Sequence, residues 1–408
     1  MLVNLVDLGA SSPLPVKRDI SIMAELFKQT FIMNGCGKMP FGEIRKVGSI
    51  MIPNMMQAVV CHGIEDYRLE DVPTPSPGPG DVLVKVEACG VCAGDVKAYQ
   101  GAPMFWGGGI QEPYVETPVI PGHEFVGVVA ALGEGAGELH GFQVGERVVS
   151  EQIVPCGQCR FCQRGQYWMC QVHNIYGFQQ SVNGGMAEYM IFPARGRHHK
   201  VSKDISLEAA AMIEPLACSI HAVNRAQIEL GDTVVVAGAG PLGLGMIAVA
   251  RMKNPGCLIA LDLRDDRLQL AKDFGADIIM NPDNDDVVAA VLQQTDGYGC
   301  DVYIEATGDP SGVTQGLQMI RKLGRFVEFS VFTDPTTVDW SIIGDRKELD
   351  IFGAHLSPYT YPLAIEYAQS GQIPIGEAVT HKFPLAEFAA AFQKAKERDH
   401  TVKVLLIP

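Results

Sequence analysis

The stretch that decides the fold reads Asp232–Thr233–Val234–Val235–Val236–Ala237–Gly238–Ala239–Gly240–Pro241–Leu242–Gly243–Leu244–Gly245. Its β-branched first half is typical of a buried parallel strand, and the apolar residues after the glycines predict a helix. Gly238, Gly240 and Gly243 follow the pattern G-x-G-x-x-G. Such a turn lets backbone N–H groups and a helix N-terminus approach a pyrophosphate closely. The stretch therefore predicts a strand–turn–helix unit that binds a dinucleotide.

An acidic residue at a suitable distance supports this interpretation. Asp262 lies nineteen residues after Gly243, at the end of a second apolar strand, Cys257–Leu261. A carboxylate at that point accepts hydrogen bonds from the adenosine ribose hydroxyls and repels a 2′-phosphate. We therefore expect the cofactor to be NAD rather than NADP.

Strand and helix patterns alternate after this unit, whereas the preceding residues, from about 58 to 194, have a β texture. The alternation predicts an α/β, doubly wound parallel sheet. It covers the following segments: 234–237, 242–251, 258–262, 266–274, 277–280, 287–294, 302–306, 313–320 and 326–329. The last fifty or so residues add two helices and a strand, so the nucleotide domain is expected to be inserted between two parts of a β-rich domain.

Charge and composition narrow the function classes. The 408 residues carry a net charge of −15, which argues against nucleic acid or an anionic membrane as a partner. The N-terminus lacks a basic region and a cleavage site, and the longest apolar run is broken by glycines and a proline. We expect a cytoplasmic protein, in which clustered cysteines bind metal more readily than they form disulfides.

Four of the eleven cysteines, Cys156, Cys159, Cys162 and Cys170, lie within one loop of little apolar periodicity. Four thiolates at this spacing can enclose one Zn²⁺ with no position left for a substrate, which predicts a structural zinc. An iron–sulfur cluster, a nucleic-acid zinc ribbon and chance spacing are the alternatives.

A second set of residues is typical of an open metal site. Cys92, His123 and Glu214 would supply S, N and O ligands and leave a fourth position free. Glu124 could ligate transiently or support the ligands, and Asp95 could accept the second N–H of His123. Taken singly, a cysteine or histidine is more often structural. Glu214, however, would be costly to bury unpaired in its apolar helix.

Together these features resemble the zinc-dependent medium-chain dehydrogenase family over residues 57–408. The resemblance is carried by residues 122–129 and 145–148, the cysteine quartet, 214–216, 238–243 and 304–308. It implies a Rossmann sheet inserted into a GroES-like catalytic domain, with an extension at 1–55, the catalytic domain at 56–216 and 353–408, and the NAD domain at 217–352. It also implies one catalytic and one structural zinc per chain. The catalytic zinc ligands fall on Cys92 and His123, completed by Glu214 or Glu124. The NAD contacts fall on Gly238, Gly240, Leu242, Gly243, Asp262 and Arg267.

Glutamate at position 214 is similar to the sorbitol and threonine dehydrogenase branch, and residues 102–107, 149–156 and 165–170 resemble its erythritol/L-threitol dehydrogenases. The resemblance implies oxidation of a secondary hydroxyl of a small polyol to a ketone with NAD, by a homodimer or homotetramer. A threonine or primary-alcohol dehydrogenase and a non-catalytic NAD-binding protein are the alternatives.

One position departs from the family pattern. Many members carry Ser or Thr two residues after the zinc cysteine as a proton relay, and Gly94 stands there in this chain. Lys97 occupies a position where histidine is frequent, so we expect water, a substrate hydroxyl or Lys97 to carry the proton. Phe105, Trp106 and Tyr114 are candidates for the substrate wall, with loop packing as the alternative.

Overall fold

The computed structural model describes residues 44–47, 50–108, 112–397 and 400–408. Of the extension expected at 1–55, residues 1–43 lie outside the described residues. The two strands that follow it, β1 (Ile44–Val47) and β2 (Ile50–Pro53), form an antiparallel hairpin. Residues Ile44–Pro408 form one compact unit.

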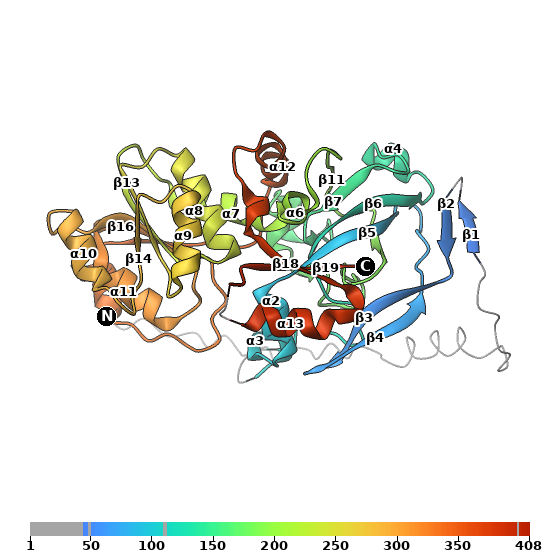
Figure 1. Cartoon of the computed structure of the whole chain (residues 1–408), viewed down its shortest axis with the longest axis horizontal. Helices are drawn as coiled ribbons and strands as arrows, with labels where there is room; N and C mark the ends of the chain where they lie inside the picture. The colour runs from blue at the N-terminus through green and yellow to red at the C-terminus, as the bar shows by residue number, and fades with distance from the viewer. Residues whose placement is uncertain (1–43, 48–49, 109–111, 398–399) are drawn as a thin grey trace, which may run out of the picture. The chain divides into compact units, whose positions relative to one another are not determined.

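The first large sheet has seven strands and is built around β5 (Val82–Val91) (Figure 1). Its strands run in the order β11-β7-β6-β5-β19-β18, and β10 also pairs with β5. The other members are β6 (Glu124–Leu132), β7 (Arg147–Ser150), β10 (Tyr189–Phe192), β11 (His198–Lys200), β18 (Val379–Pro384) and β19 (Lys403–Ile407). Two two-stranded sheets accompany it: β3 (Met55–Gly63) with β4 (Asp66–Pro73), and β8 (Ile153–Val154) with β9 (Asn174–Ile175).

The second large sheet has six parallel strands in the order β14-β13-β12-β15-β16-β17. They are β12 (Thr233–Ala237), β13 (Cys257–Leu261), β14 (Ile278–Met280), β15 (Cys300–Glu305), β16 (Ile320–Glu328) and β17 (Asp350–Gly353). The helices α8 (Pro241–Met252), α9 (Asp265–Asp273), α10 (Val287–Gln294) and α11 (Pro310–Met319) connect them. The apolar β12, with residues 234–236 fully buried, lies at the centre, as expected for a strand covered on both faces.

The chain enters and leaves the parallel sheet through two connections. Helix α7 (Ile213–Ala226) precedes β12 and contacts β6 of the first sheet as well as β15 and β16 of the second. After β17 the chain continues through α12 (Tyr361–Ser370) and α13 (Phe388–Lys396) and ends in β19, which pairs antiparallel with β5. The expected insertion of a doubly wound sheet into a β-rich domain is confirmed.

Two local details differ from the expectation. The apolar helix expected around Glu214 is divided at Met212 into α6 (Leu207–Ala211) and α7. Strand β17 has no counterpart among the expected strands, because it has only four residues and three of them are exposed. No helix of the described ranges has the length and apolar content needed to cross a membrane.

Gly243 should be irreplaceable for packing. A Cβ at this position would lie 1.8 Å from the carbonyl oxygen of Gly238, so α8 could not stay against the turn. We expect Gly243→Ala to lower the free energy of unfolding of the cofactor-free protein by about 3 kcal/mol, as severe overpacking does. Urea denaturation measures this. Gly240→Ala is the matched control, since its Cβ would meet only Arg267 Nη1 at 3.7 Å. Equal stability of the two variants would contradict this account of the turn.

Candidate functional site

Cys92 begins the short helix α2 (Ala93–Tyr99), directly after β5. Its backbone N–H donates to Asp95 Oδ2 at 2.9 Å, and its sulfur accepts from the Gly94 N–H at 3.4 Å. This capping arrangement fixes the cysteine at the end of the sheet. It also leaves Asp95 Oδ1 free of the helix, 3.6 Å from His123 Nδ1.

Glu124 reaches its partner by crossing a strand. It lies opposite Gly90 of β5, and β19 flanks the other side of that strand. A Cβ on Gly90 would stand 2.2 Å from Glu124 Oε2, so only glycine leaves room for the carboxylate. Oε2 accepts a 2.5 Å hydrogen bond from Lys403 Nζ. Both side chains are about 97% buried, and the Glu124 carboxylate raises the pKa of the Lys403 ammonium despite burial.

Glu214 lies in the first turn of α7 and is 8% exposed. Its Oε1 accepts from Gln152 Nε2 at 2.6 Å and from Cys218 Sγ at 3.3 Å. Burial raises the pKa of this carboxyl to about 7, and the charges of His123 and Glu124 also act on it.

These side chains fit a metal ion. The ligand atoms of Cys92, His123 and Glu124 all lie within 4.8 Å of one another, a group that does not include Glu214. His123 Nδ1 and Asp95 Oδ1 are buried without a hydrogen-bond partner, as expected where a metal would orient the imidazole. Among the described residues, none donates to Glu124 Oε1 or Glu214 Oε2. Each carboxylate therefore has one oxygen held by the protein and one left over.

The four clustered cysteines form the second metal candidate. Cys156, Cys159, Cys162 and Cys170 are free thiols, and their ligand atoms also lie within 4.8 Å of one another. Backbone N–H groups donate to the sulfurs of Cys156, Cys159 and Cys170. The backbone N–H of Gln171, followed by that of Cys162, lowers the pKa of the Cys159 thiol to about 6, which favours the thiolate that zinc binds. The set is closed, as a structural zinc requires.

The glycine turn follows β12 as expected. Gly238 has φ +98°, and a Cβ there would meet the Ala306 carbonyl oxygen at 2.7 Å. Leu242 packs against the central apolar core. Asp262 follows β13 and accepts from the Ala239 N–H at 2.7 Å, so its carboxylate lies beside the turn. Arg267 lies near Gly240, and its Nε is buried without a partner, which fits an anionic group of a ligand.

A cavity of about 520 Å³ opens at the carboxyl ends of β16 and β17, where ligands bind in open parallel sheets. It is lined by Trp168, Met169, His221, Arg225, Glu328, Phe329, Ser330, Gly353, Ala354 and His355. His355 Nε2 forms a 2.8 Å hydrogen bond with His173 Nε2. Burial lowers the pKa of both imidazoles, that of His355 to about 4, so the pair is neutral near pH 7.

An aromatic row connects this pair to the first metal candidate. The ring of His123 lies 5.6 Å from that of Phe178, and Phe178 lies 5.6 Å from Tyr114. Tyr114 lies 5.6 Å from His173, and Phe105 stacks on Phe178 at 5.2 Å. Trp106, the third aromatic residue expected at the substrate wall, donates its indole N–H to the Ala98 carbonyl.

Lys97 extends from α2 across to the second sheet. Its ammonium donates to the carbonyl of Val331, which follows β16, and its Nζ would lie 3.5 Å from a Cβ on Gly308. Burial lowers the pKa of Lys97. Lys97 is thus placed between the cysteine end of β5 and the ends of the parallel strands.

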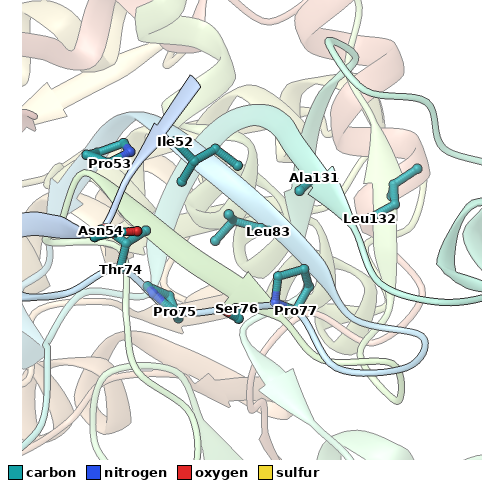
Figure 2. Close-up of a pocket in the computed structure, with 10 residues that line it drawn as sticks. All are labelled: Ile52, Pro53, Asn54, Thr74, Pro75, Ser76, Pro77, Leu83, Ala131 and Leu132. Carbon is teal, nitrogen blue, oxygen red and sulfur yellow. The ribbon is translucent and has the colours of Figure 1, made fainter. Parts of the chain in front are cut away.

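A second, smaller cavity of about 140 Å³ has a different character (Figure 2). It lies between the end of β2, the proline-rich turn at 74–77 and strands β5 and β6. None of its described lining residues is titratable, so it offers no acid–base or metal chemistry.

Comparison with known proteins agrees with this geometry. Residues 78–203 match the family model of the alcohol dehydrogenase GroES-like domain, and residues 241–370 match that of zinc-binding dehydrogenases. The chain is 54% identical to the erythritol/L-threitol dehydrogenase of Mycolicibacterium smegmatis over 360 residues, 88% of this chain and 99% of that protein. The chain belongs to the zinc-dependent medium-chain dehydrogenase family. It is also 34% identical to the sorbitol dehydrogenase of Halalkalibacterium halodurans, over 85% of this chain and 97% of that enzyme.

Solved structures of the family have the same fold. A putative zinc-binding dehydrogenase from Sinorhizobium meliloti, bound to NADP, is 29% identical with a TM-score of 0.78 and covers 87% of this chain and 99% of its own. An alcohol dehydrogenase from Escherichia coli CFT073, complexed with NADH, is 29% identical with a TM-score of 0.77 and covers 87% and 100%. The expected GroES-like and Rossmann architecture is confirmed.

Several residues at the site were not predicted from the sequence, Phe178 of the aromatic row among them. Lys403 carried a usable signal, because a lysine in the apolar strand Val402–Ile407 needs a buried partner. Gln152, His173 and His355 gave none, since their partners lie far away in the chain.

The two cysteine groups should respond differently to substitution. We expect Cys159→Ser to lose about one zinc per chain together with thermal stability, because the lobe that holds the four cysteines, residues 156–170, has little apolar core. Cys92→Ser should also lose about one zinc, yet keep its melting temperature and NADH binding while activity disappears. Metal analysis, thermal unfolding and NADH fluorescence check this. A stable Cys159→Ser variant that retains two zincs would contradict the assignment.

Proposed function

We propose that the chain is an NAD-dependent polyol dehydrogenase that oxidises a secondary hydroxyl of a four-carbon polyol, erythritol or L-threitol, to the ketone erythrulose. The alcohol gives a hydride to NAD and a proton to the medium, and the reaction is reversible. The observation that carries the proposal is the group Cys92, His123 and Glu124 at the end of β5. The 54% identity to an erythritol/L-threitol dehydrogenase supports the substrate.

Cys92, His123 and Glu124 would hold the catalytic zinc, and Cys156, Cys159, Cys162 and Cys170 the structural one. Zinc at the first site supplies a Lewis acid that lowers the pKa of an alcohol hydroxyl, and NAD supplies the hydride acceptor. Asp95 orients the His123 imidazole through Nδ1. Lys403 neutralises Glu124, so that one carboxylate oxygen stays directed at the metal position. Glu214 adds its unpaired oxygen beside this group.

NAD would lie over the glycine turn. The turn at 238–243 would approach the pyrophosphate. Arg267 would add a positive charge there, since the Nε of its guanidinium lacks a protein partner. Asp262 would bind the ribose hydroxyls, which favours NAD. The nicotinamide end would then reach the carboxyl ends of β15 to β17.

The substrate would lie against a wall that is apolar near the metal and polar farther away. Phe105, Phe178 and Tyr114 form the apolar part. The pair His173 and His355 forms the polar part, since no described residue bonds either Nδ1. A hydrogen-bonded pair of neutral imidazoles leaves one donor and one acceptor, which suits the hydroxyls of a polyol.

Cytoplasmic location and assembly into a homodimer or homotetramer belong to the same proposal. The cysteines of the described ranges are all free, which suits a reducing compartment. Strand β17 is an exposed edge strand with Ile351 44% accessible, and such an edge can pair with a second copy. A threonine dehydrogenase on the same scaffold is the second candidate function, because the Glu214 carboxylate would suit the amino group of threonine.

A substrate comparison tests the function. We expect kcat/KM to be highest for erythritol or L-threitol, above threonine and ethanol, and about tenfold higher with NAD than with NADP. NADH formation at 340 nm measures it. His355→Phe keeps the ring but removes its nitrogens, so it should weaken polyol use more than ethanol use. Turnover of threonine alone, or of no alcohol, would overturn the proposal.

Lys97 should carry the proton in place of the missing hydroxyl. Lys97→Met should lower kcat about 100-fold, a usual effect for a lost proton-transfer group. Gly94→Ser in that variant should restore part of the rate, because a Cβ there would stand at ordinary contact distances, 3.7 Å from Cys92 Sγ and 3.9 Å from Phe105. Steady-state kinetics measure both, with the exposed Lys85→Met as control. An unchanged kcat in Lys97→Met would remove the lysine from the mechanism.

A further inference from the structure

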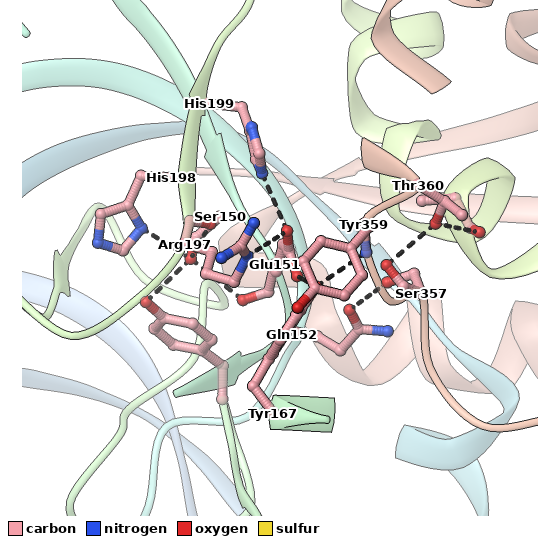
Figure 3. Close-up of polar contacts among 12 residues, drawn as sticks. Ser150, Glu151, Gln152, Tyr167, Arg197, His198, His199, Ser357, Tyr359 and Thr360 are labelled. Atoms are coloured by element: carbon pink, nitrogen blue, oxygen red, sulfur yellow. Dashed lines mark hydrogen bonds and ion pairs between the residues drawn. The ribbon is translucent and has the colours of Figure 1, made fainter. Parts of the chain in front are cut away.

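Gln152 lies between β7 and β8, is 2% exposed, and is bonded at both ends of its amide. Figure 3 shows the bond at the oxygen end, to Ser357. Its Nε2 donates to Glu214 Oε1 at 2.6 Å and to Cys218 Sγ at 3.2 Å. Its Oε1 accepts from Ser357 Oγ at 2.7 Å. A carboxylate only accepts, so the amide nitrogen must face Glu214 and the amide oxygen must face Ser357. The orientation of Gln152 is thereby fixed.

This bond decides which oxygen of Glu214 is available. Oε1 receives both Gln152 and Cys218, whereas Oε2 has no donor among the described residues. The charges of His123 and Glu124 act on the same carboxyl. With one oxygen held by two donors, the carboxylate cannot rotate without leaving buried donors unpaired, which is costly.

Ser357 connects this carboxylate to the second sheet. It belongs to the segment 354–360, by which the chain returns from β17 to the β-rich part. In the same segment Thr360 Oγ1 donates to the Ala217 carbonyl of α7 at 2.8 Å, and the Tyr359 N–H donates to Tyr167 OH at 2.9 Å. Ser357, like Gln152, is 2% exposed. Both connections between the two sheets, α7 and the return segment, therefore meet at Gln152.

The neighbouring residue shows that the contact is specific to Gln152. Glu151 accepts instead from Tyr167 OH of the cysteine lobe and from Arg197 and His199 at β11 (Figure 3). Two adjacent buried polar residues thus serve different partners. Glu151 holds the lobe, and Gln152 holds Glu214.

We propose that Gln152 is a positioning residue that holds Glu214 by one oxygen, turns the other toward the catalytic metal and substrate, and makes this orientation depend on the return segment through Ser357. The inference rests on the proposed place of Glu214 beside the zinc site. It deepens that function by naming a device that couples the nucleotide domain to the metal centre.

Gln152→Met tests it, because methionine has a similar length and no amide. We expect kcat/KM to fall about 10–100-fold, as when an outer partner of a metal site is lost. The fall should appear in kcat, with NADH affinity unchanged. Two readouts do not depend on turnover: the visible spectrum of the Co²⁺-substituted holoenzyme should shift, and a chelator should remove one of the two metals faster than from the wild type.

Ser357→Ala and the double variant separate positioning from simple stability. Ser357→Ala keeps Gln152 but frees its amide, so it should cause a smaller change of the same kind, and it serves as the test if Gln152→Met does not fold. The double variant should be no worse than Gln152→Met, because both act through one chain of bonds. Thr360→Val is the control. It cuts the same segment from α7 and should lower the melting temperature without changing the Co²⁺ spectrum.

An unchanged Co²⁺ spectrum and chelator rate in Gln152→Met and Ser357→Ala would overturn the inference, whatever happens to activity. Additive losses in the double variant would also overturn it. If the wild type oxidised no polyol while the spectrum still shifted, the proposed function would fail and the positioning role would stand.

Discussion

Two carboxylates buried where the two sheets meet, Glu124 and Glu214, impose the constraint on which the rest of the site depends. An unpaired charge in such a place would cost several kcal/mol. The protein provides a hydrogen-bond donor for one oxygen of each carboxylate. Lys403 donates to Glu124, and Gln152 donates to Glu214. A carboxylate oxygen of Glu124 lies within 4.8 Å of the ligand atoms of Cys92 and His123, where a divalent cation can complete the neutralisation. The burial of these two carboxylates and the binding of a cation therefore depend on each other.

The architecture around the carboxylates serves this arrangement. Gly90 opens β5 so that Glu124 can cross it, and β19 returns from the far end of the chain to bring Lys403 to the other side. Helix α7 begins next to the first sheet and ends at the second, so Glu214 belongs to the link between them. The cysteine lobe is held separately, through Tyr167 and Glu151. Each part of the fold contributes one restraint to a group of side chains that the sequence separates widely.

The sequence predicted what depends on local pattern. The glycine turn, the alternating strands and helices and the cysteine quartet are short-range signals, and each lies where it was expected. The pair Cys92 and His123 could be joined only through the family resemblance, because thirty residues and a sheet register separate them. Which of Glu124 and Glu214 lies with Cys92 and His123 could not be predicted from the sequence at all, since it depends on which residue lies opposite Gly90. Gln152, His173 and His355 escaped prediction because a polar side chain in a loop acquires meaning only from its partner, and their partners are up to 205 residues away.

Lys403 stands on the last strand of the chain, and this position has a consequence for the order of synthesis. The parallel sheet is contiguous, from Thr233 to Gly353, and can form while the chain is still growing. The first sheet cannot, because β19 follows the parallel sheet in the chain and pairs with β5 only after it has been synthesised. Until then Glu124 has no counter-charge. The glycine turn can thus form during synthesis before Lys403 reaches Glu124, so the side chains proposed to hold the catalytic metal come together after the nucleotide-binding part of the fold.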